Sequence, residues 1–443
     1  MKKISLIVAL TSSLLFADAQ MQTNNDENLI DIEKRGDWVI LPYMFSSEST
    51  GLVGGVGTIA QGLLQPQTTL VASIFYGVEE DIITNGVETA ESFSGGFISY
   101  SNLKIPYTDR LFFSFWGLNK YTPKGMYYIN GSMDSKEGSG LLSSGETNYF
   151  YTTLSYVLPI GEGLNNPDGK YKLRDGFAMD REGFGNGTPF TTGRTKIGLE
   201  TFYITQDYDN WLDIAKWTGI TSKPEWNSSG FKLFLEHDNT DFDLNPSRGY
   251  SFSAKYSQDG GGGDNLQSWD FLEFKYSKYF ELDNFSFSKQ DVLAINGWTG
   301  YSFSWDTDSE VFPAIATERP PLDEGGRLGG MMRMRGYDSN RFSGKAVLYG
   351  TAEYRSILKY NPFQSEKFLK KHTPIAIDWF QIVGFVEAGA VSDGYDSNLI
   401  TDMKFDVGLS LRAMAAELPV RFDVAYGDEG VNMWVMIHHP FDF

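Results

Sequence analysis

The stretch MKFDVGLSLR, residues 403–412, decides the fold class because apolar and polar residues alternate along it. Met403, Phe405, Val407, Leu409 and Leu411 share one parity, and the residues between them are small, polar or charged. Successive side chains of a β-strand point to opposite faces, so the stretch predicts a strand. Its polar face would meet water in a soluble sandwich, whereas in a membrane barrel it would line the lumen. Alternation alone leaves both readings open.

The same period of two recurs along the whole chain. Clear examples are 231–236, 250–257 and 420–426, each with charged residues on the second face. Sixteen strands are predicted, near 38–45, 51–60, 68–78, 92–101, 109–119, 147–157, 193–205, 230–237, 249–257, 268–280, 290–304, 344–357, 379–391, 402–414, 418–426 and 432–441. An even count suits a closed barrel, and closure leaves no unpaired strand edge in lipid. We therefore expect an all-β, transmembrane antiparallel β-barrel of about 16 strands.

The N-terminus predicts export. Lys2 and Lys3 precede the apolar run 4–16, and Ala17-Asp18-Ala19 fits a cleavage site, so residues 1–19 are expected to be a signal peptide. No cysteine follows, which excludes a lipid-anchored lipoprotein and a disulfide framework. No later apolar run reaches the ~20 residues of a transmembrane helix. We expect a short periplasmic tail at 20–37 and a barrel at 38–443, located in the bacterial outer membrane.

The C-terminal strand carries a second localisation signal. Met433, Val435, Ile437, Phe441 and Phe443 share one parity, interrupted by His439. A terminal phenylalanine on an alternating strand is typical of outer-membrane barrels, whose assembly machinery reads that end. Phe441 and Phe443 are therefore predicted to form a C-terminal assembly signal.

Charge and composition exclude several functions. Without residues 1–19 the basic residues fall from 37 to 35 and the acidic ones from 57 to 56, a net charge of −21 that disfavours nucleic acid. The stretch 241–252 lacks the glycine and glutamate of a calcium loop, so no metal or cofactor is predicted. Acid clusters at 207–213 and 306–310 read as hydrated loops more readily than as divalent-ion bridges to lipopolysaccharide. With four histidines and no G-x-S-x-G elbow, an enzyme is not expected.

The spacing of the strands predicts the loops. If the first strand runs outward, the outer segments are 79–91, 120–146, 206–229, 258–267 and 305–343. The periplasmic segment 158–192 is too long for a turn and could hold a further pair of strands. The segment 305–343 is too long to be a passive turn, and structureless loops of that size are usually functional or disordered.

Several short motifs occur in a fixed order. Asp238-Asn239 is followed by Pro246-Ser247-Arg248-Gly249, and the long loop holds Gly325-Gly326 and then Arg335-Gly336-Tyr337. Phe385-Val386-Glu387-Ala388-Gly389 lies on a later strand. Together they resemble the bacterial surface antigen family of sixteen-stranded barrels, which includes the barrel-assembly protein BamA, TamA and the two-partner-secretion transporters. The resemblance covers roughly residues 230–443; residues 38–229 match only as generic barrel strands.

The resemblance implies that the long loop folds back into the lumen with Arg335, Gly336 and Tyr337 at its tip. An arginine inside a narrow barrel can be held by a wall carboxylate through charge-assisted hydrogen bonds. By parity Glu387 and Asp406 point inward, so Arg335–Glu387 is the first expected pair and Asp406 a second acid. The alternative is that these are ordinary solvated lumen charges.

Two further sets of residues belong to the same expectation. Glu353 and Arg355 share the lumen parity and are read as a structural network across the wall. Asp238, Asn239, Pro246, Arg248 and Gly249 match the family's turn motif.

Function is expected to follow the family: translocation or insertion of a polypeptide or lipid at the outer membrane. The expected partners are outer-membrane lipid and lipopolysaccharide, the barrel-assembly machinery during biogenesis, a polypeptide or lipid client, and a second copy in a homo-oligomer. About 18 residues separate the signal from the first strand, too few for the family's polypeptide-transport-associated repeats. The alternative is therefore a passive channel or structural surface barrel that has lost protein handling.

Overall fold

The structure is a computed structural model. It describes residues 38–47, 50–84, 87–128, 131–136, 140–169, 173–179, 187–209, 226–261, 268–305, 318–321, 323–365, 377–415, 418–437 and 439–441. The predicted signal peptide, the tail 20–37 and Phe443 lie outside these residues. Among the described residues, no helix has the length and apolar character needed to cross a membrane.

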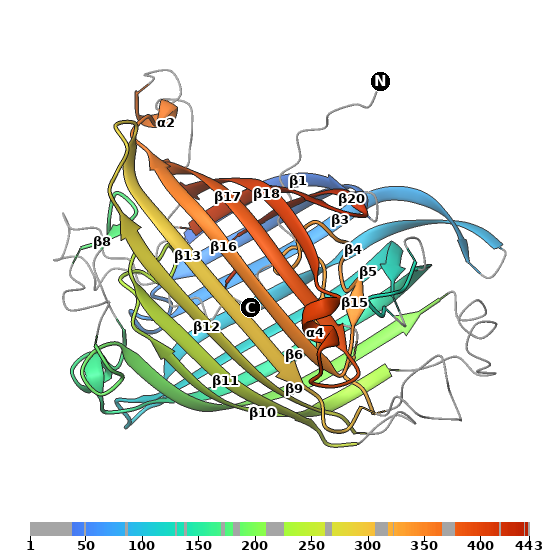
Figure 1. Cartoon of the computed structure of the whole chain (residues 1–443), viewed down its shortest axis with the longest axis horizontal. Coiled ribbons are helices and arrows are strands. Elements are labelled where there is room, and N and C mark those ends of the chain that lie inside the picture. Colours follow the sequence, from blue (N-terminus) through green and yellow to red (C-terminus); the bar gives the residue numbers. More distant parts are fainter. Residues whose placement is uncertain are drawn as a thin grey trace.

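Sixteen strands form one sheet, and each pairs antiparallel with its neighbour along the chain (Figure 1). The predicted count and order are confirmed. The strands are β1 (Trp38–Ser47), β2 (Gly51–Gln61), β3 (Thr69–Thr84), β4 (Val87–Lys104), β5 (Leu111–Tyr127), β6 (Leu141–Val157), β9 (Arg194–Tyr208), β10 (Trp226–Asp238), β11 (Gly249–Asp259), β12 (Asp270–Leu282), β13 (Ser288–Tyr301), β16 (Ala346–Leu358), β17 (Ile377–Ser392), β18 (Lys404–Ala415), β19 (Leu418–Gly427) and β20 (Gly430–Ile437).

The burial of β18 decides between the two readings of alternation. Phe405 and Leu409 are each 65% exposed, whereas Asp406 and Arg412 are each 2% exposed. A soluble sheet would bury the apolar face and hydrate the charges. Here the apolar face looks outward and the charged face inward, as a lipid-embedded barrel requires.

The lumen is less uniformly polar than the alternation predicted. Aromatic side chains of β3, β4, β6, β9, β12 and β13 are buried in one cluster that also contains apolar residues of the long loop. The loop contributes Leu328, Met334 and Phe342, each fully buried. Apolar wall residues can face inward here because the loop, rather than water, covers them.

The outer ends of several strands extend further than predicted. Residues 79–91 were expected to form an outer loop, yet Glu79–Thr84 of β3 pair with Val87–Ser92 of β4. Strand β5 likewise runs to Tyr127 and β6 begins at Leu141, inside the predicted segment 120–146. Hydrophobic periodicity detects the part of a strand that meets lipid. It misses these extensions, in which most residues are polar or charged and the alternation is lost.

The remaining elements are short. The segment 158–192 holds η2 (Gly161–Leu164) and a two-residue pair, β7 (Leu173–Arg174) with β8 (Phe177–Ala178), which is separate from the main sheet. The suspected extra strands therefore do not cross the membrane. The connections around β17 contain α2 (Pro362–Ser365) and α4 (Asn398–Thr401), and the long loop contains β14 (Arg327–Leu328) paired with β15 (Phe342–Ser343).

The last strand ends earlier than predicted. Strand β20 stops at Ile437, and Phe441 is 3% exposed instead of facing outward. Pro440 lacks an N–H for the ladder, and the residue before a proline is conformationally restricted, so the alternation cannot continue through it. The prediction that Phe441 shares the outward face of the strand is wrong.

Candidate functional site

The long loop enters the barrel as a β-hairpin. Arg327 and Leu328 of β14 pair with Ser343 and Phe342 of β15, and residues 329–341 form the connection between them. Gly329 has φ +104°, and a Cβ there would lie 2.1 Å from a backbone oxygen of the returning chain. Only glycine fits this backbone, so the sequence itself makes the hairpin turn inside the lumen.

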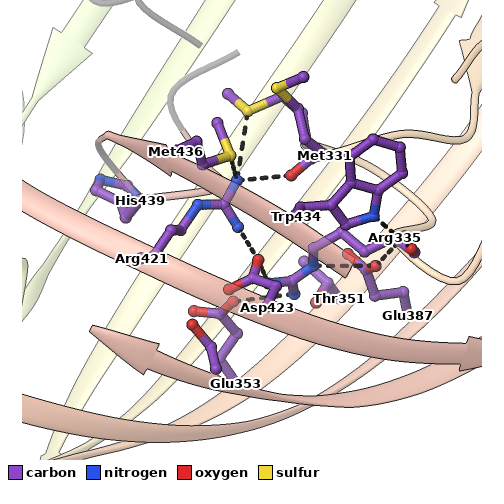
Figure 2. A network of polar contacts seen from close by, with 12 residues as sticks. Met331, Arg335, Thr351, Glu353, Glu387, Arg421, Asp423, Trp434, Met436 and His439 are labelled. Carbon is purple, nitrogen blue, oxygen red and sulfur yellow. Dashed lines mark hydrogen bonds and ion pairs between the residues drawn. The ribbon is translucent and has the colours of Figure 1, made fainter. Parts of the chain in front are cut away.

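Arg335 lies at the centre of the site (Figure 2) and is fully buried. Its Nη2 lies 3.0 Å from Glu353 Oε1, its Nη1 3.0 Å from Asp423 Oδ2, and its Nε 3.2 Å from Glu387 Oε2. The carbon between these nitrogens also lies 3.4 Å from the ring centre of Phe385, a cation–π contact. The planar guanidinium can serve three acids on three strands because its donors point outward in one plane.

The backbone of the tip is held as well. The Arg335 amide donates to Glu387 Oε2 at 2.6 Å, and the Gly336 amide donates to Asp406 Oδ2 at 3.0 Å. The indole of Trp434 donates to the Arg335 carbonyl at 2.7 Å. A Cβ on Gly336 would lie 2.6 Å from the Cβ of Asp406, so the tip approaches the wall as closely as a glycine allows.

Tyr337 completes the tip on the outer side. Its hydroxyl donates to Asp428 Oδ1 at 2.5 Å and lies 3.2 Å from the carbonyl oxygen of Phe405. Asp428 lies in the turn between β19 and β20 and also pairs with Lys404 at 2.7 Å. Partial burial raises the pKa of the Asp428 carboxyl, but the hydrogen bonds from Lys404 and Tyr337 outweigh this and lower it.

The structure thus brings the predicted tip and both predicted wall acids together, with differences in their roles. Glu387 pairs with the Arg335 guanidinium, whereas Asp406 binds the backbone of Gly336. Glu353 and Arg355 were expected to form a structural network across the wall, and they pair at 2.8 Å. Glu353 also contacts Arg335 directly, so the tip and this network share one carboxylate.

Three charged participants were not predicted: Asp423, Arg412 and Arg421. Arg421 pairs with Asp423, and its Nη2 donates to the Met331 carbonyl at 2.6 Å. Arg412 Nη2 donates to Glu353 at 2.8 Å. All three lie on the polar parity of their strands, which the sequence gives. Their height in the barrel depends on register, in which Ser410 faces Asp423 and Arg412 faces Arg421.

The loop is also attached to the opposite wall. Glu324 accepts hydrogen bonds from Tyr151 of β6 and Lys232 of β10, each at 2.7 Å. Asp323 accepts from Tyr149, and Gln206 of β9 lies 3.3 Å from the same carboxylate. The hairpin therefore reaches across the lumen from β16–β19 to β6–β10.

A third set of contacts lies toward the outer end. Arg341 is fully buried and pairs with Glu429 of the β19–β20 turn at 2.6 Å, and it donates to Ser135 between β5 and β6. Asp338 accepts from the Tyr128 hydroxyl at 2.7 Å. These contacts connect the loop to the β19–β20 turn and to the β5–β6 connection.

The predicted turn motif lies elsewhere, between β10 and β11. Asp238 Oδ1 accepts from the Thr240 amide at 2.8 Å, and the Asn239 amide donates to Tyr250. Pro246 is buried and Arg248 is exposed. Gly249 has φ +96°, and a Cβ there would lie 2.0 Å from the Asn239 oxygen. These residues shape a turn, and no contact joins them to Arg335 within the described residues.

Phe441 is on the inner side of the barrel, against Tyr279 and Arg355. Its predicted role in assembly stays a prediction. No group of histidines and acids able to hold a metal is found among the described residues.

This fold and site define a class of protein: a sixteen-stranded β-barrel that carries an arginine-bearing hairpin inside its lumen. An Omp85 superfamily domain matches residues 149–432, more than half of the sequence. The chain therefore belongs to the Omp85 superfamily, and the resemblance read from its motifs is confirmed. The family points to the bacterial outer membrane.

Three solved structures are similar to this chain. BamA from Haemophilus ducreyi lacking POTRA domains 1-3 matches with a TM-score of 0.46 and 14% identity over 91% of this chain and 70% of that one. CdiB from Acinetobacter baumannii matches with a TM-score of 0.48 and 13% identity over 93% of this chain and 67% of that one. CdiB from Escherichia coli matches with a TM-score of 0.48 and 11% identity over 90% of this chain and 61% of that one. This chain therefore spans less than two thirds of the Escherichia coli protein. No curated protein matches the sequence.

Proposed function

We propose that this barrel takes part in the translocation or insertion of a polypeptide or a lipid at the bacterial outer membrane. The observation that carries the proposal is how the hairpin is held. It crosses the lumen, yet its strands β14 and β15 pair only with each other in the described residues. The Ser343 amide donates to the Gly131 carbonyl of the β5–β6 connection at 2.7 Å, and every other contact between the hairpin and the barrel named above involves a side chain. The hairpin can therefore leave without breaking the hydrogen-bond ladder of the sixteen-stranded sheet.

Two routes would make use of this barrel. In the first, the hairpin leaves the lumen and a client passes through the pore. In the second, the wall opens sideways between β1 and β20, the end strands of the sheet. Strand β20 is short, and no backbone pairing between it and β1 occurs among the described residues, which supports a seam at this place.

The partners follow from the proposed place and role. They are outer-membrane lipid and lipopolysaccharide, the barrel-assembly machinery during biogenesis, and one polypeptide or lipid client. A homo-oligomer is compatible with the outward apolar face. No catalytic activity belongs to the proposal, because the site consists of ion pairs and hydrogen bonds that hold a loop.

Depletion of the protein, followed by profiling of outer-membrane proteins and lipids, tests the proposal. Loss of one client or a defined lipid change is expected. A tether then separates the two routes: Tyr128→Cys with Asp338→Cys, joined by a short bis-maleimide, would hold the hairpin inside, since these side chains touch and the chain has no other cysteine. The unlinked double variant is the matched control. Failure of the tethered protein to restore the profile indicates the first route, and full restoration the second.

The alternative is a structural barrel or passive channel without a client. The contacts of Glu324 with the opposite wall favour it, because a loop held on both sides resists release. An outer-membrane profile that does not change on depletion would support this alternative and would contradict the proposal.

A further inference from the structure

One carboxylate in the lumen serves three arginines. Glu353 accepts charge-assisted hydrogen bonds from Arg335, Arg355 and Arg412, all of which are at least 98% buried. Arg335 has two further acids, Glu387 and Asp423. Arg355 and Arg412 have no second ion-paired carboxylate within the described part of the chain. The part of the cluster around Arg355 and Arg412 therefore carries more positive charge than its one carboxylate neutralises.

Arg335 and Arg421 each leave only their Nε without a hydrogen-bond acceptor, and the remaining unpaired nitrogens of the cluster belong to the same two arginines. Both Nη atoms of Arg355 and Nη1 of Arg412 are buried without a hydrogen-bond acceptor in the described residues. Their guanidinium groups are neighbours, since Arg355 Nε and Arg412 Nη2 contact the same Glu353 oxygen at 2.8 and 2.9 Å. Buried unpaired donors on a cation are costly, and an oxyanion is the group that would satisfy them.

The C-terminal segment 439–441 covers the Arg355 side of this pair. The ring centre of Phe441 lies 4.8 Å from the guanidinium carbon of Arg355, and the ring also packs against Tyr279. His439 Nε2 donates to a backbone oxygen of the β10–β11 turn at 3.0 Å, and Lys275 donates to the Phe441 carbonyl at 3.2 Å. An aromatic face attracts the cation but offers its N–H groups no acceptor in their plane. The Phe441 ring therefore keeps water from the Arg355 guanidinium but accepts no hydrogen bond from its Nη atoms.

We propose that Arg355 and Arg412 form an oxyanion site, for a carboxylate or a phosphate group, and that segment 439–441 is its displaceable cover. When Phe441 moves aside, the two Nη atoms of Arg355 form the fork that binds an oxyanion through two parallel hydrogen bonds. Arg412 Nη1 supplies a third donor. The anion replaces a cation–π contact with ion pairs and corrects the charge excess beside Glu353.

Calorimetry on the full chain in a non-ionic detergent tests the site. The Phe441→Ala variant is expected to bind inorganic phosphate at least tenfold more tightly than the unsubstituted protein, and adding Arg355→Gln should abolish binding. Phe441→Leu, which keeps an apolar cover, is the matched control and should resemble the unsubstituted protein. Dihexanoyl phosphatidic acid is the second probe: tighter binding than phosphate identifies a lipid headgroup, and equal binding a free anion. Lack of binding by both probes overturns the proposal.

A second measurement leaves Phe441 in place. The chain has no cysteine, so Pro440→Cys gives a single buried thiol within the cover. Phosphate at saturating concentration should raise its rate of labelling by a water-soluble maleimide several-fold. Asp393→Cys, in the exposed β17–β18 connection, is the control and should react at an unchanged rate. A rate at position 440 that phosphate does not alter would refute the displaceable cover, even if Phe441→Ala fails to fold.

Discussion

Replacement of Arg335 by alanine is the perturbation that bears most directly on the closed lumen. It removes three ion pairs, at 3.0, 3.0 and 3.2 Å, from a site without solvent exposure. Removal of one partner of a buried pair typically costs about 3–5 kcal/mol. The loss depends on what the remaining acids still contact.

Two of the three acids keep another cation. Glu353 retains Arg355 and Arg412, and Asp423 retains Arg421. Only Glu387 loses its guanidinium, although it keeps the hydroxyl of Tyr349. The expected loss is therefore at the lower end, about 3 kcal/mol. Since about 1.4 kcal/mol corresponds to a factor of ten, the population with the hairpin outside should rise roughly 100-fold.

Conductance in planar lipid bilayers measures this population. Arg335→Ala should show frequent, long openings, whereas the unsubstituted barrel should stay mostly closed. Lys404→Met is the control, because the Lys404–Asp428 pair at the rim is partly exposed and exposed pairs contribute little. An unsubstituted barrel that conducts as well as Arg335→Ala would refute the inference that the hairpin closes the lumen.

Three further substitutions probe the tip, the outer face and the rim. Gly336→Ala should lower stability by about 1–3 kcal/mol, because its Cβ would lie 2.6 Å from a side-chain carbon of the wall; the temperature at which the gel-mobility shift on heating occurs measures this. Leu409→Lys places a charge on the lipid face, which lowers the folding stability of a barrel by about 2–4 kcal/mol at the bilayer midplane. This variant should refold into vesicles less well, whereas Leu409→Ile should refold normally. The pKa of Asp428 is lowered from 3.8, since hydrogen bonds from Lys404 and Tyr337 outweigh the effect of burial. The ionised Asp428 carboxylate thus contributes its full stabilisation above pH 3.8, and this stabilisation is lost as the pH falls through the lowered pKa of the folded protein. The rate at which a protease cleaves the loop, measured as the pH is lowered, should show a step that the Asp428→Asn variant lacks.

The fold was largely predictable because the alternation of apolar and polar residues is a physical requirement of a strand between lipid and lumen. Phe405, Leu409 and their neighbours on β18 show this most clearly. Residues 79–91 were misread for the same reason: beyond the membrane the requirement ends, although the β3–β4 pairing continues.

The site was predictable only in part. Parity places Glu387, Asp406 and Asp423 on the inner face but says nothing of their height, which depends on the register of neighbouring strands. The motif resemblance supplied that information for Glu387. Nothing comparable marked Asp423. Pro440 could have indicated that the alternation ends before Phe441, but a proline does not specify to which side the chain then turns.

The attachment of the hairpin to both walls also has a mechanical consequence. A barrel of sixteen strands is a wide ring that can flatten into an ellipse, and a strut fastened at Glu324 on one side and Arg335 on the other opposes that flattening. Departure of the strut would free the pore and soften the ring in the same event. Any widening at the junction of the first and last strands would then become easier, without a separate signal to that junction.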